Sequence, residues 1–214
     1  MKSPDPLKGG VATDRQTRDY YRLKAAELAR RYDGARGGIA DCFDGAFPRG
    51  GRVLDVGAGS GRDLHRLLLG GWDGWGVEPC RALIDEAERL YPAVRGRIRQ
   101  SALPALEGIG DGRFDGVVAS AVLMHLAERQ LKASLRSLRR VLKGRGRLLV
   151  SLPVDEGGKA RRGRDEEGRF FNGFSPERLE TLLAELGFAC MAREQKADGL
   201  GRKDRNWAVQ LFKL

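Results

Sequence analysis

A glycine-rich turn early in the chain has the residue types that a nucleotide-like ligand needs. Gly57, Gly59 and Gly61 occupy alternate positions directly after Arg52 to Val56, an apolar run typical of a buried strand. Glycine tolerates positive φ and lets a flat ligand lie against main chain, while the following helix N-terminus offers free N–H groups. The third glycine comes one residue too early for a dinucleotide fingerprint, and Asp55 precedes the turn. The turn therefore predicts half of a pocket for another nucleoside-like ligand.

A second carboxylate, Glu78, ends the next predicted strand, about twenty residues beyond the turn. Adjacent strand ends lie side by side in a doubly wound sheet, so this carboxylate can accept two hydrogen bonds from ribose hydroxyls. Pro79 ends the strand directly after it. An ordinary exposed acid is the alternative interpretation, and the combination with Asp55 and the glycines favours the binding role.

Apolar runs alternate with helical periodicity along the chain, which is typical of a sheet with helices on its faces. A leading helix is predicted over residues 15–32. The predicted strands are 52–56, 74–77, 96–99, 114–119 and 147–152, and the helices between them are 63–69, 81–90 and 127–142. Ser175 and Pro176 start a last helix that Gly187 ends, and the runs 189–193 and 207–213 predict an antiparallel hairpin. Residues 153–174 have no clear period and are predicted as a loop excursion.

The composition restricts the class of protein. A chain of 214 residues can bury a substantial core as one domain. The three cysteines include no Cys-x-x-Cys pair, so we expect no disulfide framework, no metal site and a reducing, cytoplasmic location. The sequence has neither a signal core nor an apolar run long enough to span a membrane. Its net charge of +10 comes from basic residues interleaved with acids, which favours a solvated surface over a nucleic-acid tract.

Nearly the entire chain resembles the class I methyltransferases that use S-adenosylmethionine (SAM), especially the bacterial methyltransferase-domain proteins. The resemblance rests on the glycine turn, its two acids and the segments Leu123-Met124-His125-Leu126 and Phe171 to Glu177. It implies an α/β, Rossmann-like, doubly wound sheet of seven strands in the order 3-2-1-4-5-7-6, with strand 7 antiparallel. It also implies an N-terminal helical lid over residues 1–45 and a SAM-binding core over 46–214 that includes the excursion.

The resemblance also assigns site residues. SAM, and its product S-adenosylhomocysteine (SAH), would contact the glycine turn, the ends of the neighbouring strands and the leading helix. The cofactor positions are Tyr20, Asp55, Gly57, Ala58, Gly59, Gly61, Asp63, Glu78, Pro79, Ser101, Ala102, Leu103, Ala119 and Ser120, and the substrate positions are Tyr21, His125, Phe170 and Phe171. Many relatives carry Asp where Ser101 stands, and a hydroxyl is a weaker partner for an adenine amino group.

The implied reaction transfers a methyl group to an oxygen, nitrogen or sulfur atom of a small molecule, which requires alignment and exclusion of water. His125 is the best-placed base if the acceptor carries a proton, and simple packing between Met124 and Leu126 is the alternative. Methylation of RNA or protein, and SAM binding without catalysis, stay open as other functions. The chain lacks an Asn-Pro-Pro-Tyr motif after the fourth strand and a Gly-x-Ser-x-Gly hydrolase motif. We expect a monomer or a homodimer that does not associate with membranes.

Overall fold

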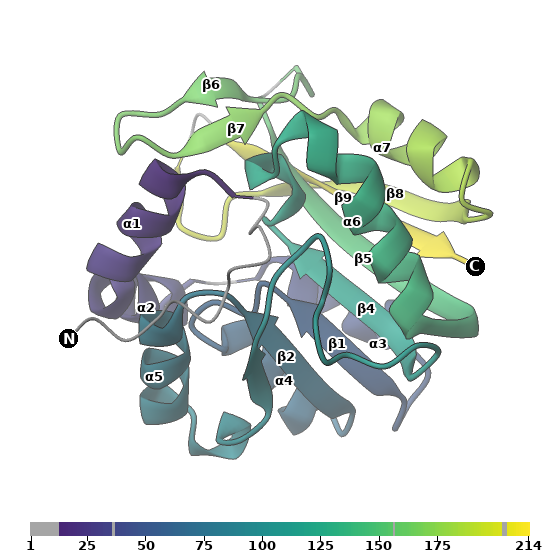
Figure 1. The fold of residues 1–214 in the computed structure, drawn as a ribbon, viewed down its shortest axis with the longest axis horizontal. Coiled ribbons are helices and arrows are strands. Elements are labelled where there is room, and N and C mark those ends of the chain that lie inside the picture. Colours follow the sequence, from purple (N-terminus) through teal and green to yellow (C-terminus); the bar gives the residue numbers. More distant parts are fainter. Residues whose placement is uncertain (1–12, 36, 156, 203–204) are drawn as a thin grey trace.

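A mixed β-sheet lies between two layers of helices in the computed structural model, which describes residues 13–35, 37–155, 157–202 and 205–214 (Figure 1). The strands of this sheet are β1 (Arg52–Val56), β2 (Asp73–Glu78), β3 (Ile98–Gln100), β4 (Phe114–Ser120), β5 (Leu142–Val154), β8 (Ala189–Ala197) and β9 (Asn206–Lys213). Their spatial order is β3-β2-β1-β4-β5-β9-β8, with β9 antiparallel to both of its neighbours. The predicted order 3-2-1-4-5-7-6 is confirmed, because β8 and β9 are the sixth and seventh strands of this sheet.

The central strands are apolar over nearly their whole length because helices cover both faces of the sheet. The helices are α1 (Arg15–Leu23), α2 (Ala25–Asp33), α3 (Phe43–Ala46), α4 (Arg62–Leu69), α5 (Arg81–Leu90), α6 (Glu128–Val141) and α7 (Pro176–Ala184). Leu54 and Val117 pack with the apolar residues of α6 and α7 on one face. Val53 and Val118 point the other way and pack with residues of α3 and α4. The carboxyl ends of β1, β2 and β4 therefore meet at one edge of a rigid core.

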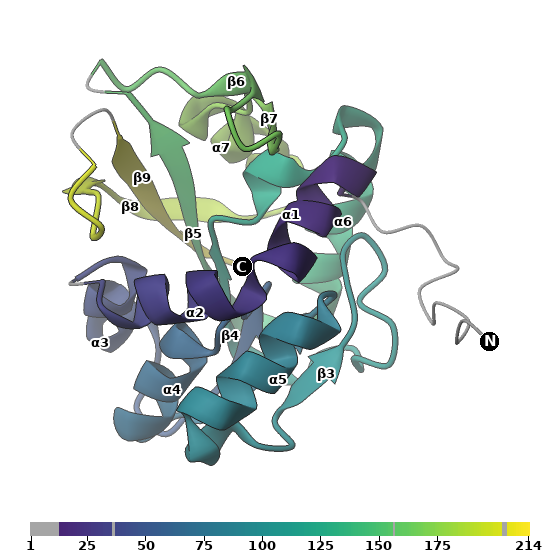
Figure 2. The ribbon, with the colours of Figure 1, turned by 90° about the vertical axis from the view of Figure 1, so that its left-hand side faces the viewer.

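In place of the single leading helix predicted over residues 15–32, the structure has two helices that are separated at Lys24. The prediction is wrong at that residue. Lys24, between α1 and α2, has φ −105° and ψ 15°, and its N–H closes α1 on the carbonyl of Tyr20. Helix α1 buries Thr17 and Tyr20, whereas α2 buries Ala25, Leu28 and Ala29. Figure 2 shows the two helices running in different directions. The break changes the direction of the chain, and both helices still contact α5.

The excursion at residues 153–174 contains regular structure that the sequence pattern did not indicate. Strand β5 continues to Val154, and β6 (Arg162–Arg164) pairs with β7 (Phe170–Asn172) in a separate two-stranded antiparallel sheet. Asp165 stabilises the turn between them, because its carboxylate accepts hydrogen bonds from the N–H groups of Glu167 and Arg169. The resulting β6–β7 hairpin lies beside α1, with the N–H of Phe170 donating to the Thr17 hydroxyl at 2.8 Å (Figure 1).

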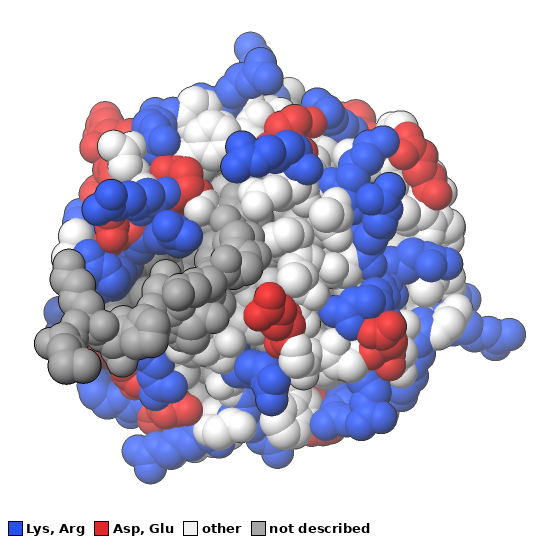
Figure 3. All heavy atoms as spheres, in the orientation of Figure 1, with Lys and Arg blue, Asp and Glu red and all other residues white. Residues whose placement is uncertain are grey.

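Basic side chains are spread over the surface. Figure 3 shows Lys and Arg across one face with Asp and Glu among them. Several cations are paired, as in Lys132 with Glu185 at 3.4 Å and Lys143 with Asp115 at 2.8 Å. No helix among the described residues is both long and apolar enough to cross a bilayer.

Candidate functional site

The glycine turn connects β1 to α4 and brings main chain to the surface of a cavity. Gly57, Gly59 and Gly61 have φ values of 73°, 55° and 77°, in the left-handed region that favours glycine. A Cβ on Gly57 would lie 2.4 Å from Cγ2 of Val122, and one on Gly61 would lie 2.8 Å from Cβ of Ala87. Both positions thus require glycine because of backbone conformation and close packing. Helix α4 begins directly after the turn, and its N-cap residue, Gly61, has no side chain that could cap the first N–H groups.

Glu78 ends β2 and connects that strand to the turn. Its carboxylate accepts hydrogen bonds from the N–H of Gly59 at 3.0 Å and from the N–H of Cys80 at 2.9 Å. Burial raises the pKa of Glu78 to about 7, although both hydrogen bonds act to lower it. Each carboxylate oxygen has a further lone pair. Glu78 can therefore accept hydrogen bonds from a ligand while holding Gly59 in place.

Asp55 and Asp63 add two more carboxylates near the turn. Asp55 is 1% exposed, and its Oδ2 atom has no hydrogen-bond partner within the described residues. Burial raises the pKa of Asp55 well above its ordinary value, and the nearby carboxylates of Asp63 and Glu78 raise it further. Arg62 pairs with Asp63 at 2.9 Å. The unpartnered oxygen suits a cationic group on a bound ligand, because such a group would stabilise the charged form that burial and the neighbouring carboxylates disfavour.

The cavity has a volume of about 810 Å³ and extends from the glycine turn to residues far away in sequence. Such a volume is typical of a small-molecule site. Lining residues distant from the turn come from α1, the segment after β4, β5, the β6–β7 hairpin, the β8–β9 turn and β9. They include Tyr21, Met124, His125, Ser151, Arg169, Leu200, Arg202 and Trp207.

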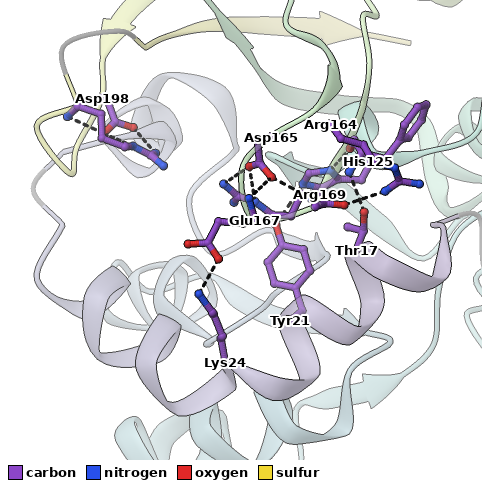
Figure 4. Close-up of polar contacts among 12 residues, drawn as sticks. Thr17, Tyr21, Lys24, His125, Arg164, Asp165, Glu167, Arg169 and Asp198 are labelled. Carbon is purple, nitrogen blue, oxygen red and sulfur yellow. Dashed lines mark hydrogen bonds and ion pairs between the residues drawn. The ribbon is translucent and has the colours of Figure 1, made fainter.

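Helix α1 and the β6–β7 hairpin together form one cover, which we call the roof (residues 15–23 and 162–172). Arg169 links the two parts, because its guanidinium pairs with Asp165 at 2.6 Å and lies 4.8 Å from the centroid of the Tyr20 ring (Figure 4). This ion pair is buried, with side chains 10% and 5% exposed. A more exposed pair, Lys24 with Glu167 at 2.5 Å, adds a second link.

His125 lies beneath the roof, in the short 3-10 helix η3 (Leu123–His125) that follows β4. Its Nδ1 atom is 2.6 Å from the carbonyl oxygen of Phe170, and its Nε2 atom is 3.1 Å from the Tyr21 hydroxyl. Asn172 holds this turn by donating to the carbonyls of Leu123 and Leu126. Burial lowers the pKa of His125 to about 4, so the imidazole is neutral at pH 7.

The β8–β9 turn forms another wall of the cavity. Asp198 organises it by accepting hydrogen bonds from the N–H of Leu200, from both the N–H and the guanidinium of Arg202, and from the Trp207 indole. Asp198 is 8% exposed, and its pKa is lowered overall because these hydrogen bonds outweigh its burial.

A family model for the methyltransferase domain matches residues 25–192, more than three quarters of the chain. The chain belongs to the methyltransferase domain family. No curated protein matches it by sequence. The predicted resemblance is confirmed, and the sheet order agrees with the Rossmann-like fold of class I methyltransferases.

Solved structures share this fold. The 1,6-didemethyltoxoflavin N1-methyltransferase of Burkholderia thailandensis has a TM-score of 0.67 at 23% identity, covering 92% of this chain and 83% of the other. The cyclase SpnF has a TM-score of 0.72 at 18% identity, covering 96% and 98%. A possible histamine N-methyltransferase from Thermotoga maritima has a TM-score of 0.64 at 19% identity, covering 91% and 98%. At these identities the likeness shows the fold alone.

SAM is the cofactor that membership of the methyltransferase domain family carries, and the cavity fits it. Main chain at Gly57 to Gly59 gives a flat ligand direct access. Glu78 offers lone pairs to a ribose, and the unpartnered Asp55 oxygen offers one to a cationic amino group. These donors and acceptors would hold the cofactor at the carboxyl ends of β1 and β2, where ligands of open α/β sheets bind.

The structure brings many of the predicted site residues to the cavity wall. Predicted residues on the wall are Asp55, Gly57, Ala58, Gly59, Asp63, Glu78, Pro79, Ser120, Tyr21 and His125. In the part of the chain that the structure describes, the other predicted positions lie behind the wall; they are Tyr20, Gly61, Ser101, Ala102, Leu103, Ala119, Phe170 and Phe171. Ser101 donates its hydroxyl to the carbonyl of Glu107 at 3.1 Å, and the neighbouring Gln100 reaches the wall in its place. Phe170 and Phe171 act on the site indirectly, since they contact His125.

Sequence reasoning missed three features of the wall. Arg169 belongs to a tract that reads as a solvated mixture of charges, and Asp198 belongs to a polar turn. Ala121 follows β4 with φ 56°, a left-handed conformation that alanine rarely adopts. Such backbone strain concentrates at functional sites, but no residue type at this position signals it.

Proposed function

We propose that this methyltransferase transfers the methyl group of SAM to an oxygen, nitrogen or sulfur atom of a small molecule. The observation that carries the proposal is a single cavity with two chemically different ends. The glycine turn and carboxylates line one end, and Tyr21, His125 and Arg169 line the other. A cofactor at the first end leaves room for an acceptor at the second.

Chain residues would supply binding, alignment and exclusion of water. Glu78 and the main chain of Gly57 to Gly59 would hold the adenosyl part, and Asp55 would face the cationic amino group. When bound, SAM supplies an electrophilic methyl group on a sulfonium. Helix α1, which belongs to the proposed lid over residues 1–45, and the hairpin of the 46–214 core would together close the cavity and keep the acceptor in line with that group.

A small acceptor suits the cavity better than a macromolecule does. Arg169 is held within the hairpin by its buried ion pair with Asp165, and it connects the hairpin to α1 by lying over the Tyr20 ring. The hairpin and α1 together cover the acceptor end. On the face in Figure 3, the basic residues of the described chain have acids among them, which favours a solvated surface there over a track for RNA. The three free cysteines suit the reducing cytoplasm as its location.

Calorimetry with SAH tests the cofactor assignment directly. We expect binding that Gly59→Arg abolishes, because the side chain would project into the cavity, and that Glu78→Ala weakens. NAD is the control ligand, and preferential binding of NAD would overturn the proposal. Incubation with methyl-labelled SAM and a library of small molecules, followed by mass spectrometry, then identifies the acceptor. SAH binding without any labelled product would favour a non-catalytic SAM-binding protein.

A further inference from the structure

The side chains of Tyr21, His125 and Arg169 lie close together at the acceptor end, and the hydrogen bonds of His125 show which atom donates each proton. The Tyr21 hydroxyl points toward His125 and Arg169 in Figure 4, and its oxygen is 3.1 Å from Nε2 of His125. The other imidazole nitrogen, Nδ1, faces the carbonyl of Phe170 at 2.6 Å. Burial raises the pKa of Tyr21, and the nearby Arg169 guanidinium acts in the opposite direction.

The chemistry of these groups fixes where each proton lies. A carbonyl oxygen only accepts hydrogen bonds, so Nδ1 of His125 carries the proton of the neutral imidazole. Nε2 is then bare and accepts a hydrogen bond from the Tyr21 hydroxyl. The Nε2 lone pair of His125 consequently accepts the Tyr21 proton and does not face the acceptor. Tyr21 can offer a lone pair of its hydroxyl oxygen to a ligand in the cavity.

We propose that Tyr21 is the catalytic residue that contacts the acceptor, that His125 receives the proton that Tyr21 passes on, and that Arg169 positions Tyr21. This inference rests on the proposed methyl transfer and narrows its substrate class. The acceptor must bring its own hydrogen-bond donor, because the Tyr21 hydroxyl proton is directed to His125. Hydroxyl compounds and weakly basic N–H compounds have such a donor.

The proposed step balances without any further reagent. A lone pair of the acceptor atom forms the new bond to the methyl carbon, while the carbon–sulfur bond breaks and its electron pair goes to sulfur. The acceptor proton passes to the Tyr21 oxygen as the Tyr21 proton passes to Nε2 of His125. Methylated acceptor leaves neutral, and His125 is left as an imidazolium whose Nδ1–H still donates to Phe170. Its extra proton returns to solvent through Tyr21 when the product departs.

The pKa of His125 determines which acceptors gain from this path. Burial lowers it to about 4; the Phe170 carbonyl, Asp165 and Asp14 act to raise it, and Arg169 acts to lower it. A base this weak cannot first deprotonate a phenol or an alkylammonium, whose pKa values are about 10. It can take the proton from a hydroxyl oxygen that is becoming positively charged as the methyl group arrives. An aliphatic amine keeps its proton after methylation and gains nothing from the relay.

Nitrogen NMR of the histidines tests the arrangement without cofactor or acceptor. The chain has two histidines, so His65→Gln assigns both signals. We expect His125 to be the Nδ1–H tautomer and to titrate only below about pH 5, well under the ordinary value of about 6.5. Tyr21→Phe should move the Nε2 signal toward that of an imidazole nitrogen without a hydrogen bond. Arg169→Met should cause a smaller move in the same direction, because Tyr21 loses its positioning residue.

Either of two NMR results would overturn the proposal: an Nε2–H tautomer of His125, or an Nε2 signal of His125 that does not change in the Tyr21→Phe variant. Phenol and anisole then probe the acceptor end of the SAH-bound protein, since only phenol can donate to Tyr21. We expect phenol to bind about fivefold more tightly, the value of one such hydrogen bond, and Tyr21→Phe to remove the difference. Equal affinities in the wild type would also overturn it. A wild type that fails to bind SAH counts against the proposed function alone, because the NMR experiment needs no cofactor.

Discussion

The two ends of the cavity are built in different ways. At the cofactor end, main chain and carboxylates come from one stretch of sequence, Asp55 to Asp63, together with Glu78 on the adjacent strand. At the acceptor end, side chains come from segments far apart, with Tyr21 and His125 separated by 104 residues and His125 and Phe170 by 45. The first end depends on local backbone conformation, and the second depends on how remote elements pack. Substitutions should therefore damage the two ends by different mechanisms.

Gly57→Ala should have the largest effect, because it acts on the backbone of the cofactor end. An alanine at φ 73° costs about 1–2 kcal/mol, and its Cβ would also meet Val122 at 2.4 Å, which adds about 1–3 kcal/mol. Relief of this contact must move the turn against which SAH is proposed to bind, so SAH affinity should fall together with stability. Urea unfolding and SAH calorimetry measure the two losses.

Gly71→Ala is the matched control for that experiment. Gly71 has φ 85°, and an added Cβ would have no atom within 4 Å. It shares the conformational cost of about 1–2 kcal/mol but not the contact, and it lies outside the cavity wall. Equal losses of stability and of SAH affinity in the two variants would contradict a special role for main chain at Gly57.

Arg169→Met should have the next largest effect, through packing of the acceptor end. The substitution leaves Asp165, with a side chain 5% exposed, as a buried carboxylate without its cation, and breaking such a pair costs about 3–5 kcal/mol. Adding Asp165→Asn should recover part of this loss, because the uncompensated charge is then gone. Urea unfolding of both single variants and the double variant measures the coupling. Full additivity would show that Arg169 and Asp165 do not stabilise each other within the hairpin.

Acid adds a second test of the same ion pair. Burial acts to raise the pKa of Asp165, but hydrogen bonds from the N–H and guanidinium of Arg169 lower it overall. A lowered folded pKa means that this stabilisation is present above the unfolded value of about 3.9. It disappears as the pH falls through the folded pKa. Wild type should lose this increment in acid, and Arg169→Met should not.

The contrast between the ends explains which features the sequence could predict. Gly57, Glu78 and the alternating apolar runs are local signals, so the sheet order, the glycine turn and its neighbouring acid are recognisable from residue types and spacing. The break at Lys24 is not, because helical periodicity continues across it and only tertiary packing separates the two helices. Arg169 reads as one charge among many. Its role arises from residues about 150 positions away, which no local pattern contains.

Glu78→Gln should have a smaller effect that depends on pH. A charged acceptor forms hydrogen bonds about 1 kcal/mol stronger than a neutral one, so SAH affinity at pH 8 should fall by about fivefold for each ribose hydrogen bond. Burial raises the pKa of Glu78 to about 7, and ribose hydroxyls favour the charged form. Wild-type affinity should therefore fall by up to about tenfold per unit as the pH drops below 7, whereas the glutamine variant should be flat. Glu88→Gln, on α5, is the control, and calorimetry from pH 6 to 8 is the measurement.

Stability of the free protein should respond to Glu78 with the opposite sign. A carboxyl whose pKa rises from 4.5 to about 7 on folding stabilises the folded state fully below 4.5. That contribution is lost as the pH rises through 7. Urea unfolding should show wild type losing stability relative to Glu78→Gln between these values. A rising difference over that range would mean that the carboxylate is already charged in the free protein.

Arg164→Ala should have the smallest effect, and it separates buried from exposed contacts within the roof. Arg164 pairs with Asp14, next to the start of α1, at 3.1 Å, but the two side chains are 44% and 29% exposed. Water and salt screen such a pair, so its removal should cost about 0.5 kcal/mol, far less than Arg169→Met. A double-mutant cycle with Asp14→Asn, which keeps a residue that can cap α1, measures the coupling by urea unfolding. Coupling as large as that of Arg169 with Asp165 would mean that the exposed edge of the hairpin, and not its buried ion pair, holds the acceptor end closed.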